Sequence, residues 1–251
     1  YAAPQLHTHV VFFNVTERAT GETRALQPQE LYKTQQYGTA IYRSELAARL
    51  IALGYEIERG ASGQPEIRGY SSDYLEASSP RRQQIQDHLE KVQRSGAGAA
   101  QIAAHQTREA KDDGSREQMQ RRHQALAEAH GHQPTLVVQA ARDRVRRGEH
   151  RVPQVTARAA VTYARDRNFE REAVVDERLL VRDALRRSMG DVSLGAIKDE
   201  VAQRVASGEF IGVEPRAGAP TGPQASGAAV PFPRLWGTRE ASQVCRREPR
   251  R

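Results

Sequence analysis

The chain has 251 residues and a formal net charge of +7 at pH 7, with 38% hydrophobic and 27% charged residues. Its single cysteine excludes an internal disulfide and a cysteine-based zinc module, and no stretch approaches the roughly 18 consecutive apolar residues of a membrane span. We therefore expect a cytoplasmic protein without a membrane span, with a lean core in one large or two small domains.

The first predicted element is a strand, Leu6–Val15, within the stretch PQLHTHVVFFNV. Side chains alternate along a strand, so His7 and His9 share one face with the apolar residues at 11, 13 and 15. Because the opposite face is also mostly apolar, the pattern predicts a central strand covered on both sides. Two imidazoles on one face can share a divalent cation at about 2.0–2.1 Å. A bare His-x-His pair can equally be packed histidines with hydrogen-bonded partners.

The elements that follow are short strands and helices. A turn at residues 18–21 leads to a short strand near Thr23–Leu26, and a helix then runs from about Pro28 to Gly54. Residues 55–67 are typical of a β-hairpin, and Ser79 followed by Pro80 marks the start of another helix. A helix rich in small residues begins near residue 97 and becomes polar towards residue 113.

Beyond Gly114 the sequence favours helices. They are predicted at residues 115–130, 137–147, 154–165, 176–188 and 193–206, followed by one short strand at 210–213. Asp176 and Ser193 are the predicted caps of the last two helices. Residues 214–251 hold half of the twelve prolines and more than half of the net charge, which is typical of a disordered tail.

These patterns predict an α+β fold, with a partial antiparallel sheet and helices followed by a mainly helical small domain and a disordered tail. The expected division is 1–113, 114–213 and 214–251. Tyr1 stands where an initiator methionine would, so we expect a piece cut from a longer reading frame.

Several stretches resemble the MobF-type conjugative relaxases, the TraI/TrwC-like proteins. They are PQLHTHVVFFNVT, IYRSELAARLIALGYEIERG, SSPRRQQIQDHL and HQTREAKDD, which are collinear with the later part of the relaxase domain over residues 4–113. The stretches NFEREAVVDERLLVRDAL and SGEFIGVE resemble the segment that links this domain to a helicase domain in that family. The resemblance implies an incomplete HUH relaxase-like fold at residues 1–113.

The resemblance also implies a function. In this family a tyrosine attacks a scissile phosphate of single-stranded DNA at a transfer origin, while three histidines hold a divalent cation. His7 and His9 match the last two of these histidines. Arg108 and Lys111, in TREAK, are candidates for contacting the DNA backbone. The expected partners are transfer-origin DNA and other conjugation proteins.

The nucleophilic tyrosines and the first metal histidine of the family precede the strand that carries His7 and His9. None of the eight tyrosines of this chain, at 1, 32, 37, 42, 55, 70, 74 and 163, matches the nucleophile. The chain also has no GxxxxGK[ST] loop, so helicase activity is not encoded within it. We expect the chain to be inactive in nicking by itself.

Two alternatives are compatible with the same pattern. An amidohydrolase-type metal hydrolase also carries His-x-His on an early strand, but it requires repeated strand–helix units with further histidines and aspartates. A non-catalytic basic helical module that binds DNA would use the His-x-His strand only for packing.

Overall fold

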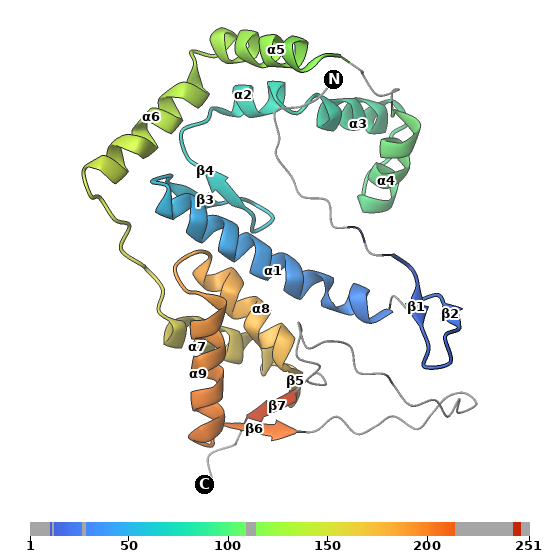
Figure 1. Cartoon of the computed structure of the whole chain (residues 1–251), viewed down its shortest axis with the longest axis vertical. Helices are drawn as coiled ribbons and strands as arrows, with labels where there is room; N and C mark the ends of the chain where they lie inside the picture. The colour runs from blue at the N-terminus through green and yellow to red at the C-terminus, as the bar shows by residue number, and fades with distance from the viewer. Residues whose placement is uncertain (1–10, 12, 27–28, 109–113, 214–242, 247–251) are drawn as a thin grey trace. The chain divides into compact units, whose positions relative to one another are not determined.

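The computed structural model describes residues 11, 13–26, 29–108, 114–213 and 243–246, which form nine α-helices and seven short β-strands (Figure 1). The helices are α1 (Gln29–Ala52), α2 (Ser72–Ala77), α3 (Pro80–Lys91), α4 (Ala97–Gln106), α5 (Arg116–Ala129), α6 (Gln133–Arg146), α7 (Ala157–Asn168), α8 (Glu177–Ser188) and α9 (Leu194–Ala206). The strands are β1 (Thr16–Glu17), β2 (Thr23–Arg24), β3 (Ile57–Arg59), β4 (Pro65–Ile67), β5 (Val174–Asp176), β6 (Phe210–Val213) and β7 (Gln243–Arg246). The predicted α+β class is confirmed.

The described residues divide into two compact units. The first unit contains Gly54–Glu56 and Ile67–Glu149, and therefore α2 to α6. The second unit contains the described residues of Val11–Leu53, Ile57–Glu66 and His150–Arg251, and therefore α1 and α7 to α9. The division at 113 and 114 stays a prediction, because compact units need not coincide with the regions that a family defines.

The core of the second unit is built on α8. Its buried apolar residues recur at helical spacing, so one face of the helix is covered by α1, α7 and α9. Asp176 and Ser193 cap α8 and α9 as predicted, accepting hydrogen bonds from the backbone N–H groups of Arg178 (2.8 Å) and Ala196 (3.1 Å). The fully buried side chains include Leu180, Leu185, Val161, Ile197 and Phe210.

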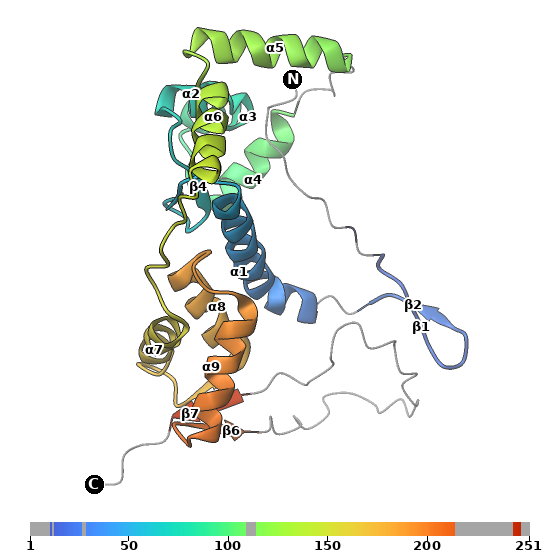
Figure 2. The ribbon, with the colours of Figure 1, turned by 60° about the vertical axis from the view of Figure 1, so that its left-hand side comes forward.

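Small residues let α1 approach α8 in the second unit, and the two helices lie side by side in both views (Figure 2). Ala40, Ser44 and Ala47 are buried along α1. Gly190, just beyond α8, has φ +83°, and a Cβ added there would come within 2.9 Å of the Ala47 Cβ. A larger residue at Gly190 would therefore push the two helices apart.

A three-stranded antiparallel sheet with the order β5-β7-β6 closes this unit (Figure 1). The sequence predicts β6 but neither β5 nor β7. Strand β7 lies within residues 214–251, predicted as disordered, so that prediction is wrong for residues 243–246; the rest of the tail lies outside the described residues. A four-residue strand gives little periodic signal. Val244 is buried in the core cluster of this unit, and β7 is held there by pairing with a strand on each side.

The predicted strand Leu6–Val15 is wrong for those of its residues that the structure describes. Residues 6–10 and 12 lie outside the described residues, and no strand is formed at 11 or 13–15. Val11, Phe13 and Val15 are 75%, 80% and 52% exposed, so the expected coverage is absent at these positions. Strand β1 begins at Thr16 and, within the described residues, pairs with β2 alone. An alternating pattern predicts a buried strand only where neighbouring strands and helices exist to cover it.

The first unit consists of helices with few buried side chains. Tyr74, Ala103 and Ala141 are its buried hydrophobic residues among those described. Gly54 has φ +89° and lies directly against α6, because an added Cβ would be 2.2 Å from the carbonyl oxygen of Ala141. Arg144 of α6 then binds the Gly54 carbonyl (3.1 Å) and the Glu56 carboxylate (3.3 Å). None of the helices in the described part of the chain combines the length and apolarity of a membrane span.

Candidate nucleic-acid interface

Of the four residues predicted to form the site, the structure describes one. His7, His9 and Lys111 lie outside the described residues. Arg108 follows α4 directly and is exposed. Within the described ranges, no group of three or more histidine, cysteine, aspartate or glutamate side chains could hold a metal ion. The part of the predicted site that the structure describes is therefore the end of α4 with Arg108, which precedes Lys111 in the chain.

The end of α4 is held by an arginine of α3. Arg81 Nη1 donates to the carbonyl oxygen of Thr107 (2.6 Å) and to its hydroxyl (2.9 Å), and Nη2 donates to the carbonyl oxygen of Ala104. The last carbonyls of a helix have no partner within the helix and carry partial negative charge. A guanidinium can satisfy several of them at once because its donors are arranged as a rigid fork. Arg81 thus fixes where the chain leaves α4.

The position of Arg81 is unfavourable for α3 itself. It lies in the first turn, where acidic residues are favoured and none is present. Its contact with α4 offsets that cost, because the same positive charge faces the negative end of another helix. Sequence reasoning missed Arg81. The available signal was two arginines, Arg81 and Arg82, directly after the Ser79–Pro80 helix start.

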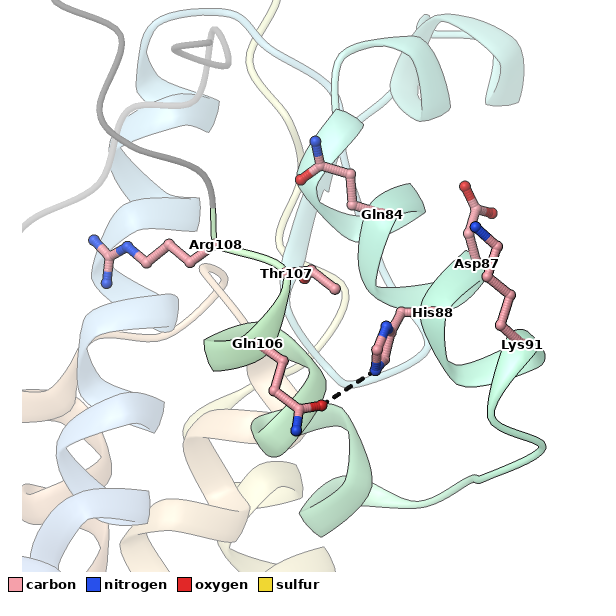
Figure 3. A pocket seen from close by; sticks show the side chains of 7 residues that line it. All are labelled: Gln84, Asp87, His88, Lys91, Gln106, Thr107 and Arg108. Carbon is pink, nitrogen blue, oxygen red and sulfur yellow. Dashed lines mark hydrogen bonds between the residues drawn. The ribbon is translucent and has the colours of Figure 1, made fainter.

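A cleft of about 440 Å³ lies between α3 and the end of α4 (Figure 3). Its lining is polar and consists of Gln84, Asp87, His88, Lys91, Gln106, Thr107 and Arg108. A hydrogen bond between His88 Nε2 and Gln106 Oε1 (3.2 Å) crosses it, so the two helices are tied at a second point. Figure 3 shows the Arg108 side chain extending away from this pair.

The charge of this cleft suits an anion. Lys91 and Arg108 are cationic and Asp87 is the one acidic residue of its lining, so the formal charge balance is positive. The lining offers cations and amide groups, which bind phosphate, and it has no cysteine or serine nucleophile. The arrangement can therefore bind and orient a nucleic-acid backbone.

Comparison with known proteins gives three findings. The TrwC relaxase family model matches residues 2–130, slightly more than half of the chain. The multifunctional conjugation protein TraI of Escherichia coli is 41% identical over 95 residues, which are 34% of this chain and 5% of TraI. Two solved structures of the conjugative relaxase TrwC are 30% identical to this chain. One is a metal-bound complex with oriT DNA, and the other is a complex with a 27-mer DNA comprising the recognition hairpin and the cleavage site.

Each TrwC match covers 47% of this chain, with a TM-score of 0.42. The share of the TrwC chain is 42% for the first structure and 44% for the second. The chain therefore spans a small fraction of TraI and less than half of these TrwC chains.

Proposed function

Because the chain belongs to the TrwC relaxase family, we propose that it is part of a conjugative relaxase, which nicks single-stranded DNA at a transfer origin. The observation that carries this proposal is the family match over residues 2–130, which contains His7, His9, Arg108 and Lys111. The polar, positively charged cleft at the end of α4 supports it.

In this proposal, His7 and His9 are two of the ligands of a divalent cation. Neutral imidazoles suit transition metals and zinc, and their one-residue spacing fits the family motif. When bound, the cation neutralises charge that develops on the scissile phosphate. Only neutral imidazoles bind a metal ion.

Arg108 and Lys111 contact the DNA backbone in this proposal. They are three residues apart, directly after the α4 end that Arg81 and His88 hold in place. A fixed starting point for this segment lowers the entropy that is lost when its cations bind phosphate. Arg81 is a positioning residue, because it acts through the backbone of α4 and through Thr107.

Nicking also requires the tyrosine nucleophile. Its hydroxyl oxygen forms a bond to phosphorus, and the 3′ oxygen of the DNA leaves as a hydroxyl. Since none of the eight tyrosines in this chain matches that nucleophile, we propose that the 251-residue chain binds DNA but does not cleave it. The family match favours neither alternative function. In particular, residues 114–213 contain five helices and two short strands, not the repeated strand–helix units of an amidohydrolase.

The proposal is tested by metal binding and DNA binding of the purified chain. Calorimetry with Zn²⁺ and with Mg²⁺ is expected to show binding that His7→Ala or His9→Ala weakens at least tenfold. His150→Ala, at an exposed loop position, is the control. Metal binding unchanged by both single variants would contradict the assignment of these ligands.

DNA binding is measured with an oligonucleotide that carries the transfer-origin sequence. Arg108→Gln and Lys111→Gln are expected to weaken its binding and to lower the salt dependence by about 0.7 for each lost phosphate contact. Cleavage of this oligonucleotide by the chain alone would refute the proposed inactivity.

A further inference from the structure

Three arginines surround one buried carboxylate in the second unit. Asp183 of α8 has a side chain that is 4% exposed, and Arg182 Nε lies 2.8 Å from its Oδ1. Arg167 Nε of α7 lies 3.6 Å from Oδ2, and Arg186 Nη1 lies 3.9 Å from Oδ1. Asn168 also donates a hydrogen bond to this carboxylate (3.1 Å). One negative charge cannot balance three guanidiniums, so the surface above Asp183 is positive.

Two further arginines extend this positive surface, and their contacts are with neutral groups. Arg59 of β3 donates hydrogen bonds to the carbonyl oxygens of Arg186 and Arg187. The guanidinium carbon of Arg187 lies 5.5 Å from the ring centroid of Tyr163. Carbonyl oxygens and an aromatic ring stabilise these cations but leave their charge in place.

Electrostatics within the cluster agree with this geometry. Burial lowers the pKa of Arg186, and the nearby guanidinium of Arg182 lowers it further. Arg43 and Arg167 act in the same direction, while Asp183 opposes them. Guanidiniums that repel one another in this way gain energy when an anion binds between them.

Helix capping alone does not account for the cluster. The negative ends of α8 and α7 favour cations in their last turns, which accounts for Arg186, Arg187 and Arg167. Arg182 lies in the middle of α8, so the helix end does not account for it. The Arg167 side chain of α7 is 61% exposed, and its Nη1 lies 3.4 Å from the hydroxyl oxygen of Tyr163. Tyr163 is itself 42% exposed, so the cluster contains an accessible aromatic ring among its arginines.

We propose that the α8 arginine cluster, defined as Arg167, Arg182, Arg186 and Arg187 with Tyr163, binds single-stranded nucleic acid. The guanidinium forks match phosphate oxygens, and the Tyr163 ring offers a surface on which an unpaired base can stack. A duplex is disfavoured because its bases are already stacked and out of reach of this ring. The cluster lies outside residues 2–130, so the inference does not depend on the relaxase match.

The test is fluorescence anisotropy of the full chain with labelled oligo-dT of about 20 nucleotides, which lacks any transfer-origin sequence. In Arg186→Gln/Arg187→Gln, Kd is expected to rise about tenfold at 0.1 M salt. The slope of log K against log salt is expected to fall by about 1.4, corresponding to two lost phosphate contacts. Both side chains are exposed, so circular dichroism is expected to show an unchanged fold.

Arg24→Gln/Arg158→Gln is the matched control, since it removes two exposed positive charges from the same unit, on β2 and α7. Equal effects of the two double variants would overturn the proposal, because they would show only a general charge effect.

Tyr163→Leu provides a second readout, in which weaker oligo-dT binding with an unchanged salt slope is expected. Wild-type binding by Tyr163→Leu, or equal binding of a duplex of the same length, would overturn the assignment to single strands. Unchanged metal binding in the His7 and His9 variants would contradict the proposed function but would change none of these results, so the two proposals fail separately.

Discussion

Replacing Arg81 with glutamine tests whether α3 holds the end of α4. The change removes one guanidinium that donates hydrogen bonds to three oxygen atoms of Ala104 and Thr107. A hydrogen bond involving a charged group contributes roughly 1.5–3 kcal/mol net, but bonds that share one side chain are not additive. Arg81 is also partly exposed, which reduces each contribution. We therefore expect local destabilisation of about 2–3 kcal/mol in total.

Amide hydrogen exchange is the appropriate measurement, because the change acts on one end of one helix. The Thr107 amide donates to the carbonyl oxygen of Ala103 (2.9 Å) and reports directly on this turn. A loss of 2–3 kcal/mol corresponds to roughly 30- to 150-fold faster exchange at Thr107. Amides in the middle of α8, in the other unit, are expected to keep their wild-type rates.

Arg82→Gln is the matched control, because Arg82 is the exposed neighbour of Arg81 in the same helical turn. It removes the same charge but does not face the end of α4. If both variants exchanged at the same rate at Thr107, the hydrogen bonds of Arg81 would not be what holds this turn. Arg81→Lys is expected to recover only part of the protection, since an ammonium lacks the planar fork.

Two further predictions concern stability. Gly54→Ala is expected to cost about 2–4 kcal/mol in urea unfolding, because its φ of +89° is unfavourable for alanine and the new Cβ would meet the Ala141 carbonyl oxygen. Gly63→Ala is the control, because Gly63 has φ +71° and an added Cβ there would have no atom within 4 Å. It reports the backbone cost alone and is expected to lower the free energy of unfolding by about 1–2 kcal/mol. Equal losses of stability in the two variants would argue against the steric contact at Gly54. Burial alone would raise the pKa of Glu209, but the hydrogen bond from Arg165 and the charge of Arg204 outweigh it, so the pKa lies below its usual value. Stability from this carboxylate is therefore present above the ordinary glutamate pKa of about 4.3 and is lost as pH falls through the lower folded value. Urea midpoints at neutral and acidic pH are expected to differ less in Glu209→Gln than in the wild-type chain, and an unchanged difference would contradict this.

Much of the local structure could be predicted because its signals are local. The caps Asp176 and Ser193 lie within three residues of the N–H groups that they bind, and Gly54 has the positive φ expected just beyond a helix end. Strand β6 was also predicted from neighbouring residues. The strand expected at residues 6–15 shows the opposite case, because alternation specifies two faces but not what covers them.

Local patterns in the sequence predict eight of the nine described helices, the caps Asp176 and Ser193, the α+β class and the family of residues 2–130. They do not predict the six-residue helix α2 (Ser72–Ala77). These patterns do not predict which distant residues come into contact. Arg81 reaches a carbonyl 26 positions away, and Arg167 meets Asp183 across two helices. Strand β7 pairs with β5 and β6, although it lies in a segment rich in proline and arginine. Periodicity and capping arise from hydrogen bonds between near neighbours, whereas these contacts depend on how the helices pack, and no local pattern encodes that.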